Sequence, residues 1–169
     1  QRDGRLAVAL PDVAQYARFV STLDGVREAY ERNDPASAIR QLMALADEAN
    51  KYIDEHKPWV LAKQDGADAE LQAVCTQGLN LFRVLAAGLA PVLPRTSAQA
   101  AAFLNAPVRA WNVLDAPLVA HAINPYAPLF TRIDPKHIDA MTDASKDTLA
   151  AAPVAPAKPA EAKKAEVAS

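Results

Sequence analysis

Hydrophobic side chains recur at steps of three and four residues along the first ninety positions, which is the spacing of one face of an α-helix. Asp12 can cap a helix, and the pattern after it predicts a helix over residues 12–32. The Asp-Pro pair at 34–35 suits the cap and first turn of a second helix over 35–56. We expect the buried stripes to be Val13, Tyr16, Val20, Leu23, Val26 and Tyr30, then Ile39, Leu42, Met43, Ala46, Ala49 and Ile53.

The third and most apolar stretch follows Gly66 and predicts the longest helix, which later prolines end. Its expected buried stripe is Leu71, Val74, Cys75, Leu79, Phe82, Leu85 and Leu89, with Pro91 and Pro94 closing the helix. Thr96 and Gln99 have capping-box spacing and predict a short helix that carries Phe103 and Leu104. Five prolines within 106–135 exclude a long helix there and predict an extended arm, before a last short helix near 135–149.

The composition agrees with an all-α fold, a helix bundle with a C-terminal arm. Hydrophobic residues make up 51% of the chain, and glycine occurs only five times. Residues 150–169 are mostly Ala, Pro and Lys with little to bury, so we expect a disordered linker after a folded domain over 1–149. The opening residues 1–4 resemble neither a signal peptide nor an initiator Met, so we expect a piece of a longer chain.

The charge, the cysteine content and the hydropathy of the chain argue against several classes of function and structure. A net charge of −2 disfavours coating of nucleic acid through its phosphates alone. One cysteine cannot form an internal disulfide or a multi-cysteine zinc site, and it fits a reducing compartment, for which the cytoplasm is the default. No run of about 18 apolar residues is present, so we expect no membrane span.

Enzyme motifs are absent from the sequence. We find no phosphate-binding glycine loop, no nucleophile elbow and no pair of histidines at metal-ligand spacing, so we expect no catalytic residue, no bound cofactor and no metal in this chain. Cys75 lies on an apolar stripe, and we interpret it as a small core residue rather than a nucleophile. His121 precedes Asn124 and Pro125, where its ring nitrogens can orient a turn.

The end of the second helix carries the most unusual group of side chains. Asn50 and Asp54 are one turn apart on one face, which we place beside the buried stripe. Pro58 stops the helix and holds Trp59 at a corner next to them. An indole beside an amide and a carboxylate can stack on an unpaired base and bond its edge. Alternatively, Trp59 plugs the bundle end and Asn50 satisfies a buried backbone group.

Three motifs carry a resemblance to a known family. They are ANKYIDEHKPWVLAK at 49–63, LFRVLAAGLAPVLP at 81–94 and NPYAPLFTRID at 124–134. In this order and spacing they resemble the C-terminal anticodon-binding domain of bacterial methionyl-tRNA synthetase, over about residues 1–149. The resemblance implies the anticodon-binding helix bundle of class I aminoacyl-tRNA synthetases, which reads the CAU anticodon of methionine tRNAs.

The resemblance also assigns the site residues. It implies that Trp59 stacks against the anticodon, that Pro58 lines the site, and that Asn50 and Asp54 are site and support residues. The family's other anticodon-reading pair, an Asn and an Arg four residues apart, belongs to a helix upstream of this sequence. Arg132 and Asp134 match a segment that folds back on the catalytic domain in relatives.

The remaining implications concern parts that the sequence lacks. The motifs of the ATP- and methionine-binding fold and the zinc knuckle are missing, so ATP with Mg²⁺, and Zn²⁺, are expected only in a separate catalytic domain. Alone, this chain should not make methionyl-tRNA. Its expected partners are the anticodon loop of tRNA(Met), the catalytic domain, and a second copy joined through a C-terminal domain that follows a linker of this kind.

Two alternatives stay open at this point. The chain could be a non-catalytic helical module that packs on a protein partner, which predicts a buried Trp59 and an exposed apolar patch elsewhere. It could also be the anticodon-binding domain of another class I synthetase, an alternative that the Pro-Trp motif at 58–59 disfavours.

Overall fold

The computed structural model describes residues 4–108, 111–130 and 135–150, and it is helical, as predicted. Its elements are α1 Val13–Glu31, α2 Pro35–His56, α3 Pro58–Leu61, α4 Asp68–Gly88, α5 Pro94–Leu104, the 3-10 turn η1 Trp111–Leu114, and α6 Pro135–Ala150. Within the described residues, the only β-pairing is an isolated bridge between Arg5 and Ala122. The predicted linker, except for Ala150, lies outside the described residues, as do Arg132 and Asp134.

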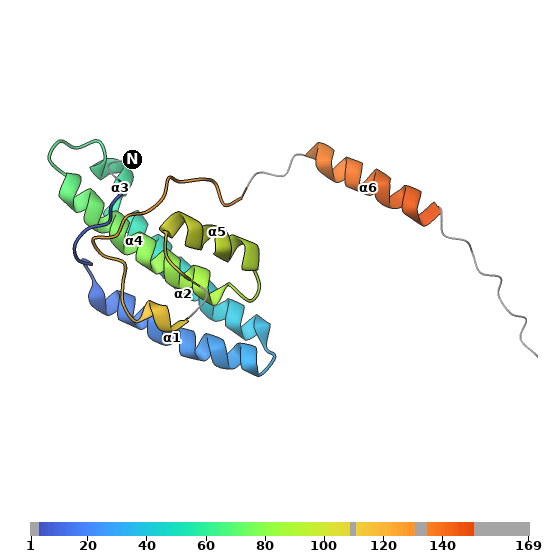
Figure 1. Cartoon of the computed structure of the whole chain (residues 1–169), viewed down its shortest axis with the longest axis horizontal. Coiled ribbons are helices and arrows are strands. Elements are labelled where there is room, and N and C mark those ends of the chain that lie inside the picture. Colours follow the sequence, from blue (N-terminus) through green and yellow to red (C-terminus); the bar gives the residue numbers. More distant parts are fainter. Residues whose placement is uncertain (1–3, 109–110, 131–134, 151–169) are drawn as a thin grey trace, which may run out of the picture. The chain divides into compact units, whose positions relative to one another are not determined.

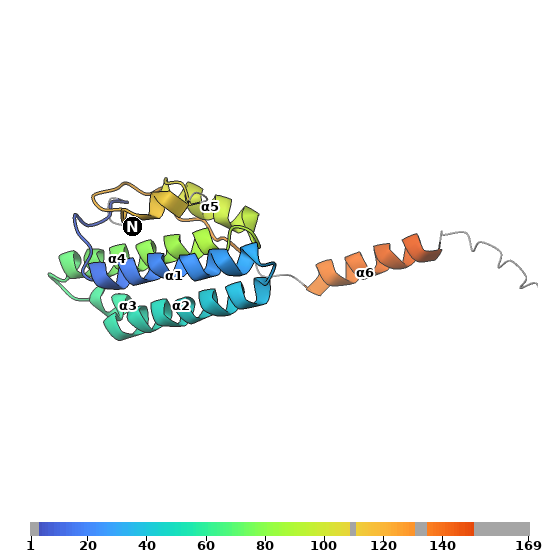
Figure 2. The ribbon, with the colours of Figure 1, turned by 90° about the horizontal axis from the view of Figure 1, so that it is seen from below.

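The chain divides into two compact units, the first ending at Leu129 and the second beginning at Phe130 with α6 inside it. In the first unit α1, α2 and α4 pack on one another, while α3 and α5 pack on α4 (Figures 1 and 2). Figure 2 shows α5 on the opposite side of α4 from α2. The largest fully buried apolar side chains are Phe19, Leu42, Leu81, Leu104 and Leu114.

The predicted boundaries of the first two helices and of the last one are confirmed within two residues. The Asp12 carboxylate accepts a hydrogen bond from the backbone N–H of Gln15 at 2.7 Å, and the Asp34 carboxylate accepts one from Ser37 at 3.0 Å. Each bond satisfies a first-turn N–H that has no partner inside its helix. These local caps explain why the helix starts could be predicted from sequence.

The predicted start of α5 is wrong. The helix begins at Pro94, with Leu93 at the cap position and no side-chain cap bond, so Thr96 and Gln99 form no capping box. Pro94 fits the first helical turn, where its missing N–H costs nothing. The Ser97 hydroxyl, three residues in, donates instead to the carbonyl of Ala86 in α4 and ties the two helices together.

The predicted buried faces of α1, α2 and α4 are also partly wrong, and in α1 the residue that differs is Val13, which is 62% exposed. In α2, Met43 is 54% exposed, while Leu45 and Tyr52 are buried in its place. In α4, Cys75 is exposed, which overturns its interpretation as a core residue, and most of the predicted stripe is only half-buried. The predicted stripe of α4 therefore faces partly outward, because another set of residues faces the interior.

That other set includes four polar side chains, which we call the α4 polar row: Thr76, Gln77, Asn80 and Arg83, each at most 2% exposed. Buried polar groups need partners, and the row finds them in irregular backbone. Two such segments cross the bundle: the lead, residues 4–12 before α1, and the arm, the described residues 105–108 and 111–129 after α5. The arm is extended apart from η1, as predicted.

The first half of the row holds the lead. Thr76 Oγ1 accepts from the backbone N–H of Ala7 at 2.8 Å. The Gln77 amide donates to the Asp12 carbonyl at 2.9 Å and accepts from the Asp12 N–H at 3.3 Å. Gln77 thus fixes the same residue that caps α1.

The second half of the row holds the arm. The Asn80 amide donates to the Leu118 carbonyl at 2.9 Å and accepts from the Leu118 N–H at 2.7 Å. The Arg83 guanidinium donates to the carbonyls of Val113 at 2.8 Å and Ala116 at 3.0 Å. Burial lowers the pKa of Arg83, but carbonyl dipoles, not a carboxylate, surround its charge.

His121 behaves as predicted. Its Nε2 lies 2.9 Å from the carbonyl of Leu104, the last residue of α5. Asn124 Nδ2 donates to the Ala102 carbonyl at 2.7 Å, so both side chains bind the arm to the end of α5. One ring nitrogen of His121 therefore helps to fix the path of the arm at the end of α5.

We predict that Asn80→Ala lowers the free energy of unfolding by about 2–3 kcal/mol, because the N–H and the carbonyl of Leu118 both lose their partner in a part-buried site. Gln72→Ala is the matched control on α4, since Gln72 also bonds a backbone carbonyl, that of Arg5, but from an exposed position. Its loss should stay below about 1 kcal/mol. Urea unfolding followed by circular dichroism measures both, and equal losses would contradict the role of the row.

Candidate functional site

The corner between α2 and α3 depends on one residue, Lys57, which has a left-handed backbone with φ 45° and ψ 60°. Its N–H donates to the Ile53 carbonyl at 2.9 Å and closes α2. Its carbonyl accepts from the N–H of Val60 at 2.8 Å and of Leu61 at 3.2 Å, which opens α3. Pro58 occupies the first position of α3, where its fixed φ suits a helix start.

Packing against α4 and a side-chain stack fix the end of α2. Ile53 lies over Gly78 of α4, where an added Cβ would come within 2.8 Å of Ile53 Cδ1. The rings of Tyr52 and His56 stack with centroids 4.1 Å apart, and His56 Nδ1 lies 2.8 Å from the Tyr52 carbonyl. Tyr52 is 7% exposed, and its hydroxyl has no hydrogen-bond partner. The corner is therefore built on a well-packed helix end.

Asn50 and Asp54 are both exposed on α2, one turn apart as predicted. Because Leu45 and Tyr52, rather than Met43, line the buried side of α2, the two polar residues lie further from the core than we expected. Among the described residues, neither side chain makes a hydrogen bond or an ion pair. Asn50 therefore does not satisfy a buried backbone group, and both polar heads are available to a ligand.

Trp59 is 51% exposed, and α3 contains no buried residue although it packs on α4. Trp59 therefore does not plug the bundle end. The structure shows no ring contact and no hydrogen bond between Trp59 and Asn50 or Asp54 among the described side chains. What it brings to one corner is a half-exposed indole on α3, a half-buried Pro58, and two unpaired polar groups on the last two turns of α2.

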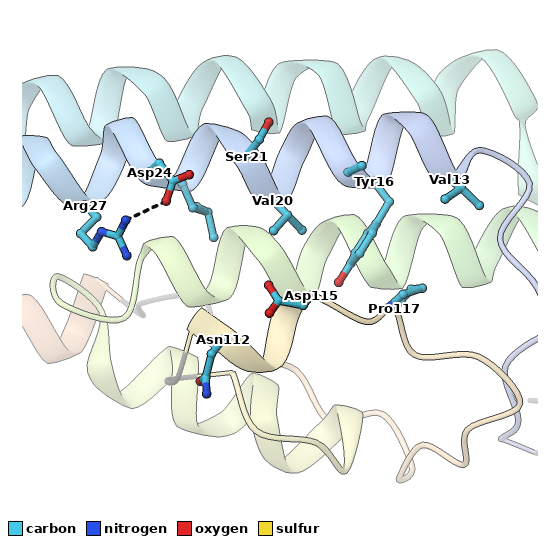
Figure 3. Close-up of a pocket in the computed structure, with 11 residues that line it drawn as sticks. Val13, Tyr16, Val20, Ser21, Asp24, Arg27, Asn112, Asp115 and Pro117 are labelled. Carbon is cyan, nitrogen blue, oxygen red and sulfur yellow. Dashed lines mark hydrogen bonds and ion pairs between the residues drawn. The ribbon is translucent and has the colours of Figure 1, made fainter.

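Two hollows lie elsewhere on the first unit. A groove of about 530 Å³ follows α1 and η1 (Figure 3). Val13, Tyr16 and Val20 line it from α1, and the Asp24–Arg27 ion pair lies at one end of it. A wider hollow of about 1140 Å³ lies between the lead, α4 and the arm, and Cys75 lines it. Neither hollow contains Asn50, Asp54, Pro58 or Trp59.

The part of the chain that the structure describes has neither a candidate metal site nor a candidate membrane span. No group of three or more His, Cys, Asp or Glu side chains is placed to hold a metal ion in this part of the chain. None of the helices described has the length and apolar character needed to cross a membrane.

The sequence interpretation missed the α4 polar row, although a signal was present. Thr76, Asn80 and Arg83 follow one another at steps of four and three, so they share one helix face. A polar face on the most apolar helix indicates buried hydrogen bonding. The predicted stripe of α4 contains only the neighbouring apolar residues and Cys75, and it leaves this polar face out.

Comparison with known proteins assigns the family. The model of the anticodon-binding domain of methionyl tRNA ligase matches residues 10–146. The chain therefore belongs to the family of anticodon-binding domains of methionyl-tRNA ligase. It is 71% identical over 163 residues to the methionine–tRNA ligase of Xanthomonas campestris pv. campestris strain B100, and 72% identical over 162 residues to that of Xanthomonas axonopodis pv. citri strain 306.

These alignments cover 95% and 96% of this chain but 24% and 23% of the relatives, so the chain spans about a quarter of their length. Among solved structures, the apo form of Mycobacterium tuberculosis methionyl-tRNA synthetase matches with a TM-score of 0.69 and 22% identity, over 79% of this chain and 29% of that one. Its complex with methionyl-adenylate matches with a TM-score of 0.63 and 23% identity, over 78% and 28%. At this identity, the likeness shows the fold.

We predict that Cys75 is a poor nucleophile despite its exposed position. Burial of the thiol raises its pKa above the ordinary value, which reduces the thiolate fraction at neutral pH. Alkylation by iodoacetamide, followed against pH by mass spectrometry, should show a midpoint above that of a free cysteine in a short peptide. A midpoint below the peptide value would instead indicate an activated thiol.

Proposed function

We propose that this chain reads the CAU anticodon of tRNA(Met) as part of a methionine–tRNA ligase, which joins methionine to its tRNA using ATP. The observation that carries the proposal is the half-exposed Trp59 at the same corner as the unpaired polar groups of Asn50 and Asp54. In the proposal, the indole stacks on an unpaired anticodon base. Pro58 sets the direction in which the indole leaves the corner.

The polar groups supply what stacking lacks. Stacking tolerates every base, because each base has an aromatic face. The Asp54 carboxylate can only accept hydrogen bonds, which suits the exocyclic amines of cytosine and adenine. The Asn50 amide both donates and accepts and can pair with a base edge in two directions. The corner thus combines affinity from the ring with selection from two polar heads.

The weak overall charge is compatible with this function. Recognition of a few splayed bases at a loop needs fewer phosphate contacts than coating of a strand does. The net charge of −2 is therefore no obstacle. Further parts of the proposal lie outside this chain: a catalytic domain with ATP and Mg²⁺, a Zn²⁺ site in that domain, a homodimer formed through a C-terminal domain, and a cytoplasmic setting.

The alternative of a protein-interaction module predicted a buried Trp59, and the indole is 51% exposed. The groove along α1 could receive a protein segment. However, its charged residues Asp24 and Arg27 pair with each other, so they do not indicate what kind of protein would bind there. An anticodon-binding domain of another class I synthetase is disfavoured by the family match. Reading of CAU remains the best-supported function.

We predict that this chain binds a fluorescein-labelled anticodon stem-loop with CAU more tightly than one with UAU, measured by fluorescence anisotropy. Trp59→Ala should weaken CAU binding roughly 5- to 150-fold, the equivalent of about 1–3 kcal/mol of stacking. Met43→Ala is the control, because Met43 is a 54% exposed apolar residue about 21 Å along α2 from the corner. It should change binding less than twofold.

The same three proteins should also be made as chimeras in which this chain replaces its counterpart in the Xanthomonas campestris ligase, with folding checked by circular dichroism. The Trp59→Ala chimera should lose aminoacylation of tRNA(Met), mainly through KM. Folded chimeras that neither discriminate CAU from UAU nor respond to Trp59→Ala would refute the proposed function.

A further inference from the structure

Lys57 occupies a backbone conformation that lysine seldom adopts. Residues with a left-handed backbone at the end of a helix are usually glycine, because a Cβ there costs roughly 1–2 kcal/mol. Four residues other than glycine have positive φ among those described: Asn33, Lys57, Asn105 and Ala120. Asparagine tolerates this region, and Lys57 is the one charged member of the set. A strained residue at a candidate site is a reason to ask what its side chain does.

The backbone of Lys57 is fixed, but its side chain is free. Its N–H and its carbonyl are both used, in the bonds to Ile53, Val60 and Leu61. The residue is exposed, and within the described chain its ammonium has no hydrogen bond and no ion pair. The backbone hydrogen bonds therefore fix the position of the Lys57 Cα, two residues before Trp59, while the ammonium group remains unpaired.

Three exposed arginines on α1 or directly after it form ion pairs. Arg18 pairs with Glu48, Arg27 with Asp24 and Arg32 with Glu28. Closer to the corner, Lys51 lies 3.8 Å from Glu55. The sequence from 57 to 63, KPWVLAK, contains no acidic residue. Lys57 is therefore an unpaired positive charge two residues before Trp59, in a chain whose net charge is −2.

We infer that Lys57 contacts a backbone phosphate of the RNA loop whose base stacks on Trp59. This inference rests on the proposed function and adds a positioning residue to its site. A lysine ammonium binds phosphate as a compact point charge, without the planar geometry that an arginine requires. Phosphate contacts set the register of a nucleic acid and carry no sequence information. Lys57 therefore places the loop, while Trp59, Asn50 and Asp54 face the bases.

The test is the salt dependence of stem-loop binding for Lys57→Gln, Lys57→Arg and the control Arg40→Gln. Gln keeps a Cβ and so keeps the backbone cost of residue 57, while it removes the charge. Arg40 is an exposed cation without an ion pair on the same helix, about 25 Å along α2 from the corner. Each lost phosphate contact in single-stranded RNA lowers the slope of log affinity against log salt by about 0.7.

We expect Lys57→Gln to reduce the magnitude of the slope by about 0.7 and to weaken CAU and UAU stem-loops by the same factor. Lys57→Arg and Arg40→Gln should keep the wild-type slope. An unchanged slope in folded Lys57→Gln overturns the inference, and so does an altered ratio of CAU to UAU affinity. The proposed function fails separately, through loss of CAU preference in the wild-type proteins or no response to Trp59→Ala.

Discussion

The two hydrogen bonds between the Asn80 amide and the backbone of Leu118 are the interaction on which the rest of this structure depends. A side-chain amide here takes the place of a neighbouring strand and satisfies both the N–H and the carbonyl of one part-buried residue. Gln77 does the same for Asp12 in the lead, whereas Thr76 accepts only from the N–H of Ala7 and Arg83 only donates to carbonyls of the arm. One helix thereby organises irregular chain on both sides of itself, although no sheet is present among the described residues to do so.

The bundle therefore contains two groups of polar residues: buried ones that bond the backbone, and exposed ones that are available to a ligand. Inside, the α4 polar row bonds the backbone of the lead and the arm, with Arg83 Nε the one buried atom of the row that has no partner, and its removal would leave part-buried backbone without partners. At the α2–α3 corner, Asn50, Asp54 and Lys57 are exposed and unpaired. The first kind makes the frame rigid. The exposed residues of the corner cost little folding free energy, because their polar groups stay in contact with water and can exchange that water for a ligand.

Helix existence and most boundaries could be predicted from sequence, because caps and prolines act locally. Asp12 and Asp34 make the predicted cap bonds. The start of α5 was mispredicted, because a proline that can end one helix can equally begin the next. The buried face of α4 was mispredicted as well, since its polar residues are stable inside only through partners far away in sequence, such as Leu118.

In the candidate site, too, the residue types could be predicted from sequence, whereas the features that depend on tertiary packing could not. Trp59, Pro58, Asn50 and Asp54 could be named from the residue types and from family resemblance, but their exposure could not, because it depends on how α2 rotates against α4. Lys57 was not predicted as a site residue. A lysine before a proline predicts an extended residue, and only the structure shows the left-handed backbone that joins the two helices.

The central claim, that Trp59 is the surface on which an anticodon base stacks, can be tested most directly by ¹H–¹⁵N NMR of the tryptophan indoles. The chain has two tryptophans, so the spectrum should contain two indole N–H signals, assigned with Trp111→Phe. On addition of an unlabelled CAU stem-loop, the account predicts that the Trp59 signal shifts upfield in a saturable manner while the Trp111 signal stays in place. A CAU stem-loop that binds without moving the Trp59 signal would contradict it.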